Sequence, residues 1–295
     1  MPELPEVETI RRGLRECIVK RGAGKIREVK VFERKSMIGA EREIVGTEVK
    51  EIERKGKALI VRFKNGEAAI IHLRMTGQLV WRDEEFKGGE EDAIKHSFGG
   101  GHPNEEMVRE LPGRHTRVEI DFERGKLFFN DQRKFGFLKI VPEGEIEKDE
   151  FLRKLGKEPW EMTGEELFEK LKRHKTAPIK AVILDQTVVA GLGNIYADEA
   201  LYYAGIIPMR RAGEVSLEEA EKLLEGARVV MERSLEAGGS TIRNYVKSDG
   251  TLGDYLDLFA KVYGREGKRC EKCGKEIKKV KVGGRGTHYC SECQR

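Results

Sequence analysis

Four cysteines close to the end of the chain follow the spacing C-x2-C-x16-C-x2-C: Cys270, Cys273, Cys290 and Cys293. Two C-x-x-C pairs at this separation fit a tetrahedral zinc site of four thiolates on a small β-ribbon. Because four thiolates fill the coordination shell, we expect one structural zinc ion and no catalytic metal. A fifth cysteine, Cys17, stands alone. An odd number of cysteines, four of them close together in the sequence, argues for metal binding in a reducing compartment and against a disulfide framework.

Positive charge is concentrated at the same end of the chain. Residues 261–295 hold 11 Lys and Arg against 4 Asp and Glu, a net charge of +7, whereas the whole chain carries only +4. Basic residues on a zinc-bound hairpin suit contacts with nucleic-acid phosphates. The alternative interpretation is a charged, solvated surface without a partner.

The sequence gives no sign of a membrane segment or a secretion signal. No apolar run approaches the ~18 residues that cross a membrane. Acidic residues interrupt the N-terminal region, so it lacks the apolar centre of a secretory signal. We therefore expect a cytoplasmic protein, and we expect a monomer because no oligomerisation element is visible.

The N-terminal half predicts one helix followed by many strands. Apolar residues recur at helical spacing over residues 3–20. Between about 26 and 141 the pattern changes to short strands, with clean alternation at Val118, Ile120 and Phe122 and tight-turn signals at Asn65-Gly66 and Arg124-Gly125. Many short strands without intervening helices indicate an antiparallel sandwich or barrel. The predicted strands are 26–33, 48–54, 58–63, 68–73, 78–81, 117–122, 126–131 and 136–141.

Residues 83–116 interrupt the strand pattern. They are acidic and rich in glycine, which predicts a long loop with a short helix at 104–110. His96, His102 and His115 lie within it and could bind a metal, but a solvated loop is the expectation.

Helical signals dominate from residue 147 onward. Thr163 with Glu166, and Ser216 with Glu219, match the capping-box pattern, and the second pair predicts a helix over 216–237. Glycines at 191 and 193 precede Asn194, a good N-cap residue. Such a turn lets backbone amides approach an anion at a helix start, although a simple turn between two helices explains it equally.

The extreme N-terminus reads Met1-Pro2-Glu3-Leu4-Pro5-Glu6. Removal of Met1 would leave a secondary amine on Pro2. An α-amine has a pKa near ~8, so a useful fraction is unprotonated at neutral pH and can act as a nucleophile. Glu3 and Glu6 would be the neighbouring acid and base. On these residues alone, the ordinary acidic start of a helix remains the favoured interpretation.

Several motifs together resemble one family. PELPEVET at 2–9 resembles the N-terminal signature of formamidopyrimidine-DNA glycosylase, the bacterial enzyme for oxidised purines. Further matching segments occur in the family's order and cover the chain almost end to end, apart from 83–116. They are HLRMTG at 72–77, DQRKFG at 131–136, GNIYADEAL at 193–201, GGSTI at 238–242, YGREGKRC at 263–270 and the four-cysteine finger.

The resemblance implies an α+β fold in three domains. It implies a catalytic antiparallel β-sandwich with a leading helix at 1–141 and a helical domain with a helix–two-turn–helix motif at 142–262. A four-cysteine zinc-finger hairpin follows at 263–295. The implied activity is removal of oxidised purines, such as 8-oxoguanine and formamidopyrimidines, from duplex DNA, followed by β,δ-elimination at the abasic site.

The resemblance also implies the catalytic roles. Pro2 resembles the nucleophile that attacks C1′ of the damaged nucleotide through a Schiff base, and Glu3 resembles the acid that assists sugar opening. Glu6 resembles the helix-start carboxylate that supports the site. Lys57 resembles the hairpin lysine that reaches the lesion or its phosphates. Arg285 resembles the arginine of the zinc finger that lies near the active site.

The remaining roles concern DNA binding. His72, Arg133 and Asn194 resemble residues that contact backbone phosphates. Met75, Arg133 and Phe135 resemble the side chains that fill the gap left by the flipped base. Such wedges compensate for part of the unstacking energy, and phosphate contacts hold the kinked backbone.

The chain departs from the family pattern at three places. Lys134 replaces the second arginine expected after Arg133, which keeps the charge but loses bidentate geometry. Arg74 stands where a glycine is usual, and residues 83–116 have no counterpart. Two alternatives stay open: an endonuclease VIII-like glycosylase for oxidised pyrimidines, and a non-catalytic zinc-ribbon DNA-binding protein.

Overall fold

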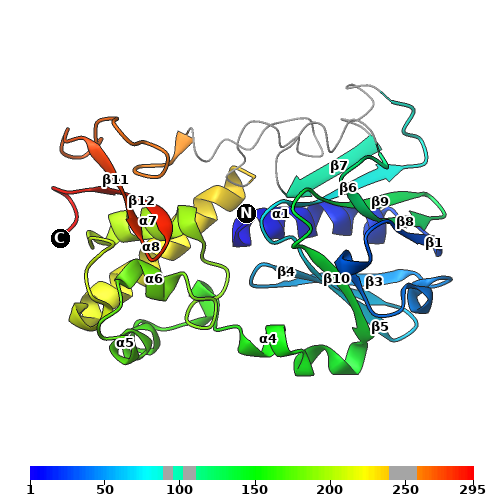
Figure 1. Ribbon diagram of the computed structural model, residues 1–295, viewed down its shortest axis with the longest axis horizontal. Helices are drawn as coiled ribbons and strands as arrows, with labels where there is room; N and C mark the ends of the chain where they lie inside the picture. Colours follow the sequence, from blue (N-terminus) through cyan, green and yellow to red (C-terminus); the bar gives the residue numbers. More distant parts are fainter. Residues whose placement is uncertain (89–95, 102–110, 239–257) are drawn as a thin grey trace. The chain divides into compact units, whose positions relative to one another are not determined.

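The computed structural model of the chain describes residues 1–88, 96–101, 111–238 and 258–295. Its elements are labelled in Figure 1. The described residues divide into two units. Met1–Arg153 form nearly all of the first unit, and Lys154–Ala237 form the second together with the C-terminal residues from 258 onward. The predicted helix at 104–110, His102 and most of the GGSTI segment lie outside the described residues.

Two five-stranded sheets build the first unit. Neighbouring strands are antiparallel, except that β2 and β10 pair in parallel. The first sheet has the order β1 (Ile26–Val31), β8 (Thr116–Phe122), β9 (Gly125–Asp131), β6 (Gly77–Asp83) and β7 (Ser97–Gly101). The second has the order β2 (Met37–Ile38), β10 (Phe137–Pro142), β5 (Glu67–His72), β4 (Ala58–Phe63) and β3 (Val49–Lys55). The predicted β-sandwich is confirmed, and each of the eight predicted strands is present with its ends shifted by at most two residues.

Helix α1 (Leu4–Leu14) joins the two sheets in one core. It continues as a π-helical turn over Arg15–Lys20, so the predicted helix over 3–20 is present with a wider last turn. Its buried apolar side chains, Val7, Ile10 and Leu14, belong to the same cluster as residues of both sheets. The helix contacts β7 of one sheet and β3 of the other, and Figure 1 shows it in blue beside these strands. The helix that follows the predicted nucleophile is therefore anchored by the main core.

Strand β7 corrects the prediction of a loop over 83–116. It pairs antiparallel with β6, and Phe98, its second residue, is 3% exposed. Phe98 packs against Gly13 of α1 so closely that a Cβ at Gly13 would lie 2.1 Å from its ring. One buried aromatic ring and one glycine thus hold a glycine-rich strand that has little strand propensity of its own.

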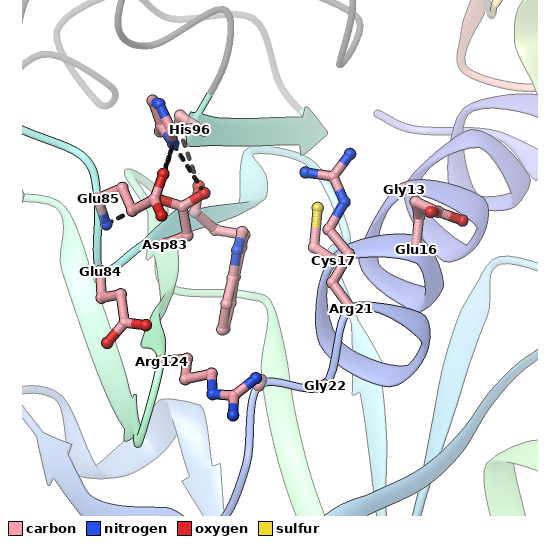
Figure 2. A pocket seen from close by; sticks show the side chains of 13 residues that line it. Gly13, Glu16, Cys17, Arg21, Gly22, Asp83, Glu84, Glu85, His96 and Arg124 are labelled. Carbon is pink, nitrogen blue, oxygen red and sulfur yellow. Dashed lines mark hydrogen bonds and ion pairs between the residues drawn. The ribbon is translucent and has the colours of Figure 1, made fainter.

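A cavity of about 140 Å³ lies between the end of α1 and this sheet edge (Figure 2). His96 Nδ1 lies 3.1 Å from both carboxylate oxygens of Asp83 there. Burial raises the pKa of the Cys17 thiol to about 11, so this thiol is protonated at neutral pH. The residues that line the cavity include none of the site residues predicted from the sequence.

The second unit is helical and ends in a two-stranded ribbon. Both predicted capping boxes are present: Glu166 N donates to Thr163 Oγ1 at 3.2 Å, and Glu219 N donates to Ser216 Oγ at 3.2 Å. No helix among the described residues is long and apolar enough to cross a membrane. A short helix, α4 (Glu150–Lys154), spans the boundary between the two units in the sequence. The helices and strands that follow it are α5 (Gly164–Arg173), α6 (Ile179–Ile183), α7 (Asn194–Ala204), α8 (Leu217–Glu236), β11 (Ile277–Val282) and β12 (Arg285–Cys290).

Candidate active site and zinc centre

The residues at the start of α1 are buried although two of them are acidic. Pro2 is buried directly before the helix, and Glu3, its N-cap residue, is 3% exposed. Glu6 is also buried, and its Oε2 accepts a hydrogen bond of 2.8 Å from Glu3 N. Glu3 and Glu6 thus form a capping box, in which each side chain accepts the backbone N–H of the other residue. This arrangement satisfies amides at the helix start and fixes the backbone that joins Glu3 to Pro2.

A second acidic residue of α1 orients the hairpin that carries Lys57. Glu8 is bonded to Arg11 and Arg12 on its own helix and lies 3.3 Å from Arg54 Nε on β3. Although burial opposes ionisation, the hydrogen bonds and charges of these arginines hold the pKa of Glu8 at about 2. Arg54 also donates to the carbonyl of Gly56 at 3.1 Å, directly before Lys57. Glu8 was not assigned a role from the sequence, because Arg54, its partner on the hairpin, is 46 residues away.

His72 is a neutral side chain in this structure. Burial, together with the positive charges of Arg74 and Lys57, lowers the pKa of His72 to about 3. Its Nδ1 accepts a hydrogen bond of 2.9 Å from Arg74 N. The ring proton must then sit on Nε2, so His72 can contact a phosphate as a neutral donor and not as a cation.

The two single-residue departures from the family pattern, Arg74 and Lys134, have left-handed backbone. Arg74 has φ of 51° and Lys134 has φ of 58°, a region that favours glycine. The glycine usual at position 74 fits this geometry better than arginine does. The Arg74 guanidinium lies 5.6 Å from the ring centroid of Phe151. Lys134 Nζ pairs with Glu33 Oε2 at 2.6 Å.

The side chains proposed to enter DNA differ in exposure. Phe135 is 55% exposed, the largest exposure of any aromatic residue among those described. Arg133 is exposed too, and its guanidinium lies 5.0 Å from the Phe135 ring centroid. Met75 is half-buried. An exposed aromatic ring backed by a cation is available to stack against a base.

In the second unit, helix α7 holds the ribbon. Asn194 Nδ2 at the start of α7 donates to Gly286 O at 3.0 Å, and Asp198 Oδ2 accepts from His288 N at 2.8 Å. Glu199 accepts three backbone N–H groups, those of residues 261, 262 and 263. Arg285 is exposed at the start of β12 and lies opposite Val282. The orientation of Arg285 therefore depends on contacts made by α7.

A fully buried ion pair reinforces this arrangement. Lys180 Nζ lies 2.6 Å from Asp198 Oδ1, with both side chains 0% exposed, and also donates to Thr287 Oγ1 at 2.8 Å. We expect Asp198→Asn to destabilise the protein by about 3–5 kcal/mol, because it leaves a buried ammonium without its counter-charge. The midpoint of thermal unfolding should fall by roughly 10 °C, as measured by circular dichroism.

The matched control replaces both charges. Lys180→Met combined with Asp198→Asn should recover part of the lost stability, since no ammonium is then left without a counter-charge and the amide oxygen at position 198 can still accept the buried His288 N–H. A wild-type unfolding midpoint in Asp198→Asn would contradict the role given to this ion pair.

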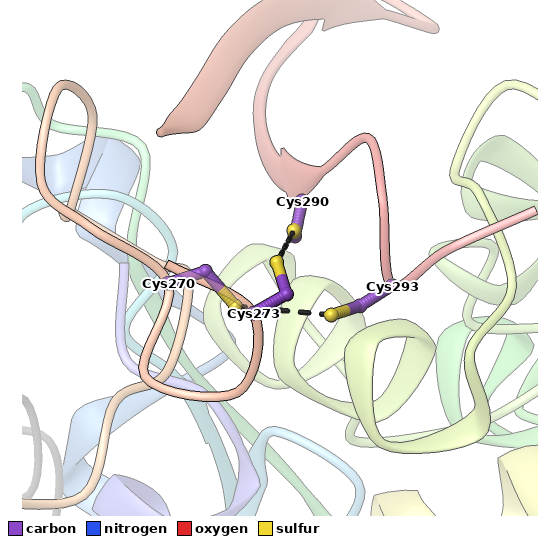
Figure 3. Close-up of side chains that lie close together, drawn as sticks. All are labelled: Cys270, Cys273, Cys290 and Cys293. Atoms are coloured by element: carbon purple, nitrogen blue, oxygen red, sulfur yellow. Dashed lines mark hydrogen bonds between the residues drawn. The ribbon is translucent and has the colours of Figure 1, made fainter. Parts of the chain in front are cut away.

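The four cysteines predicted to bind zinc come together at the base of the ribbon (Figure 3). Their sulfur atoms all lie within 4.8 Å of one another, with Cys270 and Cys293 3.9 Å apart and Cys273 and Cys290 3.4 Å apart. Tetrahedral zinc with Zn–S bonds of about 2.3 Å requires sulfur atoms about 3.8 Å apart. The cluster thus fits one structural zinc ion, and among the described residues it is the one group of His, Cys, Asp and Glu close enough to hold a metal.

The predicted site residues are distributed over both units. Pro2, Glu3, Glu6, Lys57, His72, Met75, Arg133 and Phe135 belong to the first unit, and Asn194, Arg285 and the cysteines belong to the second. Within the first unit, Lys57 and His72 are close enough for the charge of one to act on the other. Sequence reasoning missed Glu8, Thr76 and Asp131, although all three lie inside the quoted motifs.

Comparison with known proteins gives the same result along the whole chain. Residues 1–138 match the formamidopyrimidine-DNA glycosylase N-terminal domain, 155–246 its H2TH domain, and 267–295 the zinc finger found in FPG and IleRS. Formamidopyrimidine-DNA glycosylase of Exiguobacterium sp. is 38% identical, over 100% of this chain and 99% of its own.

Solved structures agree with these matches. The Lactococcus lactis Fpg in complex with abasic-site DNA has a TM-score of 0.83 at 31% identity, and MutM in complex with DNA containing carbocyclic 8-oxo-G has a TM-score of 0.81 at 32% identity. Both alignments cover 100% of both chains. This protein belongs to the formamidopyrimidine-DNA glycosylase family.

Proposed function

We propose that this protein excises oxidised purines, including 8-oxoguanine and formamidopyrimidines, from duplex DNA and then cleaves the strand at the abasic site. The observation that carries the proposal is the PELPEVET run at 2–9 in a chain that matches its relatives over 100% of its residues, with Pro2 and Glu3 buried at the start of α1. Cysteines that bind zinc and a lone Cys17 thiol suit the reducing conditions of the cytoplasm, where the protein acts as a monomer. Its domains are 1–141, 142–262 and 263–295.

The chemistry begins with the Pro2 amine once Met1 is removed. The glycosylase first extrudes the damaged nucleotide, because its C1′ is inaccessible within a stacked duplex. The amine nitrogen then bonds to C1′ and loses its proton, while the bond from C1′ to the base breaks and the base leaves with the bonding electron pair and takes up a proton. Glu3 protonates the sugar oxygen as the ring opens, and Glu6 keeps Glu3 in place. The resulting iminium acidifies the neighbouring sugar carbon, so β- and then δ-elimination cut the strand.

The remaining residues hold the DNA. Lys57, His72, Arg133, Asn194 and Arg285 contact phosphates or the lesion, and Met75, Arg133 and Phe135 fill the space that the extruded base leaves. Phosphate contacts fix the position of the protein, and the inserted side chains replace lost stacking. A binding protein without activity would explain the zinc finger equally well, but it has no need of a free proline amine.

Matched duplexes test the substrate class. Cleavage of duplexes with a single 8-oxoguanine or a single thymine glycol, at equal enzyme concentration, should favour 8-oxoguanine. Faster cleavage of thymine glycol would support the oxidised-pyrimidine alternative. Intact mass must first show that Met1 has been removed, since a retained Met1 makes the Pro2 nitrogen an amide and favours the binding-only alternative.

Phe135→Ala should impair excision more than binding. Loss of the exposed ring should slow 8-oxoguanine release by roughly ten-fold, because it removes stacking that compensates for extrusion. Affinity for undamaged DNA should change by less than about two-fold, because that affinity comes from phosphate contacts. Single-turnover kinetics and fluorescence anisotropy measure the two effects. Phe32→Ala is the control, since Phe32 is 53% exposed in the same unit; equal losses in both assays would refute an insertion role for Phe135.

A further inference from the structure

Two loops carry the three side chains proposed to enter DNA, and both loops are bonded to one buried carboxylate. The loop at 72–77 carries Met75, and the loop at 131–136 carries Arg133 and Phe135. Asp131 lies at the end of β9 and is 0% exposed. Its own backbone is fixed as well: Asp131 N donates to His115 O at 2.9 Å.

The Asp131 carboxylate joins the two loops through its two oxygen atoms. Oδ2 accepts a hydrogen bond of 2.7 Å from Gly136 N. Oδ1 accepts from Arg133 N at 3.1 Å and from the hydroxyl of Thr76. Thr76 Oγ1 in turn accepts from Arg133 N at 3.0 Å. Arg133 is itself part of this network. Met75 directly precedes Thr76 in the sequence, and Phe135 directly precedes Gly136.

Close packing leaves the loops little freedom to rearrange. A Cβ at Gly136 would lie 2.8 Å from the Phe129 ring and 3.1 Å from Asp131 Oδ2, and a Cβ at Gly77 would lie 2.3 Å from Leu73 O. Lys134, with its left-handed backbone, lies between the two amides that Asp131 binds. The Asp131 carboxylate therefore stabilises the turn at 131–136, although a lysine at its left-handed position does not favour this backbone.

We propose that Asp131 is a positioning residue that couples the two loops, so that Met75, Arg133 and Phe135 are held in one arrangement before DNA binds. The proposal rests on the proposed function. Side chains ordered in advance lose less conformational entropy when they enter the duplex, and small displacements of such groups slow a reaction strongly. Asp131 does not itself touch the reacting atoms.

Asp131→Asn tests this role. The amide keeps one acceptor oxygen but places an NH2 group against a backbone N–H, so one side of the network is lost. We expect kcat for 8-oxoguanine release to fall about ten-fold with KM within about two-fold, and 2-aminopurine placed beside the lesion to report slower base extrusion. Cleavage at a preformed abasic site should change by less than about three-fold, because no base has to leave the stack.

Thr76 and a distant carboxylate provide the controls. Thr76→Val should reproduce the loss and Thr76→Ser should restore kcat and the 2-aminopurine signal, because serine keeps the hydroxyl. In the double variant Asp131→Asn/Thr76→Val, the effects should not add, since both residues act through one network. Glu119→Gln alters a carboxylate of the same sheet that is 2% exposed and bonded to Lys126 at 2.8 Å, away from both loops, and should leave extrusion unchanged.

The positioning role is wrong if Asp131→Asn leaves base extrusion and kcat at wild-type values. It is also wrong if excision, abasic-site cleavage and thermal stability all fall in the same proportion, because that pattern indicates loss of folded protein only. Failure of the wild-type protein to release 8-oxoguanine refutes the proposed function instead. In that case, 2-aminopurine extrusion by wild type and Asp131→Asn on an uncleaved duplex still measures the positioning role.

Discussion

Incubation of the mature protein with an 8-oxoguanine duplex and borohydride should leave protein and DNA covalently joined, and peptide mapping should place the link at Pro2. Only an amine forms an iminium with C1′, and hydride transfer from borohydride reduces that iminium to a stable amine. Lys57, close to His72 in the same unit, is the lysine that a mapping experiment must exclude. Denaturing gel electrophoresis followed by peptide mass spectrometry measures both the yield and the position of the link.

Variants at the N-terminus separate the nucleophile from its surroundings. An added N-terminal residue that is not removed should abolish trapping and strand cleavage together while DNA binding persists, because the Pro2 nitrogen is then an amide. Pro2→Gly keeps a primary amine, so partial trapping should survive. Glu3→Gln should slow base release far more than cleavage at a preformed abasic site, where no base has to be expelled.

One outcome would remove the basis of the proposed function. A mature protein that begins at Pro2, binds damaged DNA, and yields neither a trapped adduct nor a released base would be a binding protein. Trapping at Lys57 would keep the activity but assign the nucleophile to another amine.

The elements that the sequence predicted well are those specified by local patterns. Short apolar segments separated by turn signals gave the eight strands, because a strand of this length is specified by its own residues and by the turns at its ends. Thr163 and Ser216 were recognised as helix caps because their partners lie three residues away. The cysteine spacing gave the zinc site because each C-x-x-C pair forms locally.

The features that the sequence did not predict depend on tertiary contacts. Strand β7 is held by Phe98 against Gly13, two residues 85 positions apart, and its glycines carry no strand signal of their own. Asp131 appeared in a quoted motif without a role, since its hydroxyl partner Thr76 is 55 residues away. Glu8 was overlooked for the same reason. Buried carboxylates of this kind can be identified only once the strands that bring their partners together are placed.

Removal of zinc should abolish DNA binding and leave most of the helix and strand content intact. The ribbon has a small apolar core of its own, formed by Val262, Cys270, Ile277 and Cys290, and the four central residues of β11 are exposed. Helices α6 and α7 also contact β12, but so small an apolar cluster should not keep the cysteine end of the ribbon ordered without the metal. The large cluster of the first unit contains none of these residues and should stay folded.

The measurement combines three signals on the same sample. Chelation of the metal should release one equivalent of zinc, leave most of the far-ultraviolet circular dichroism, and raise the Kd for abasic-site DNA by at least about 100-fold at fixed salt, because the basic residues of the ribbon are then no longer held in one arrangement. Zinc added back should restore binding. Cys17→Ser is the control, because Cys17 lies in the core of the first unit, outside the cysteine cluster. DNA binding that survives complete metal removal would show that the phosphate contacts of the first unit are sufficient and that the ribbon is dispensable for affinity.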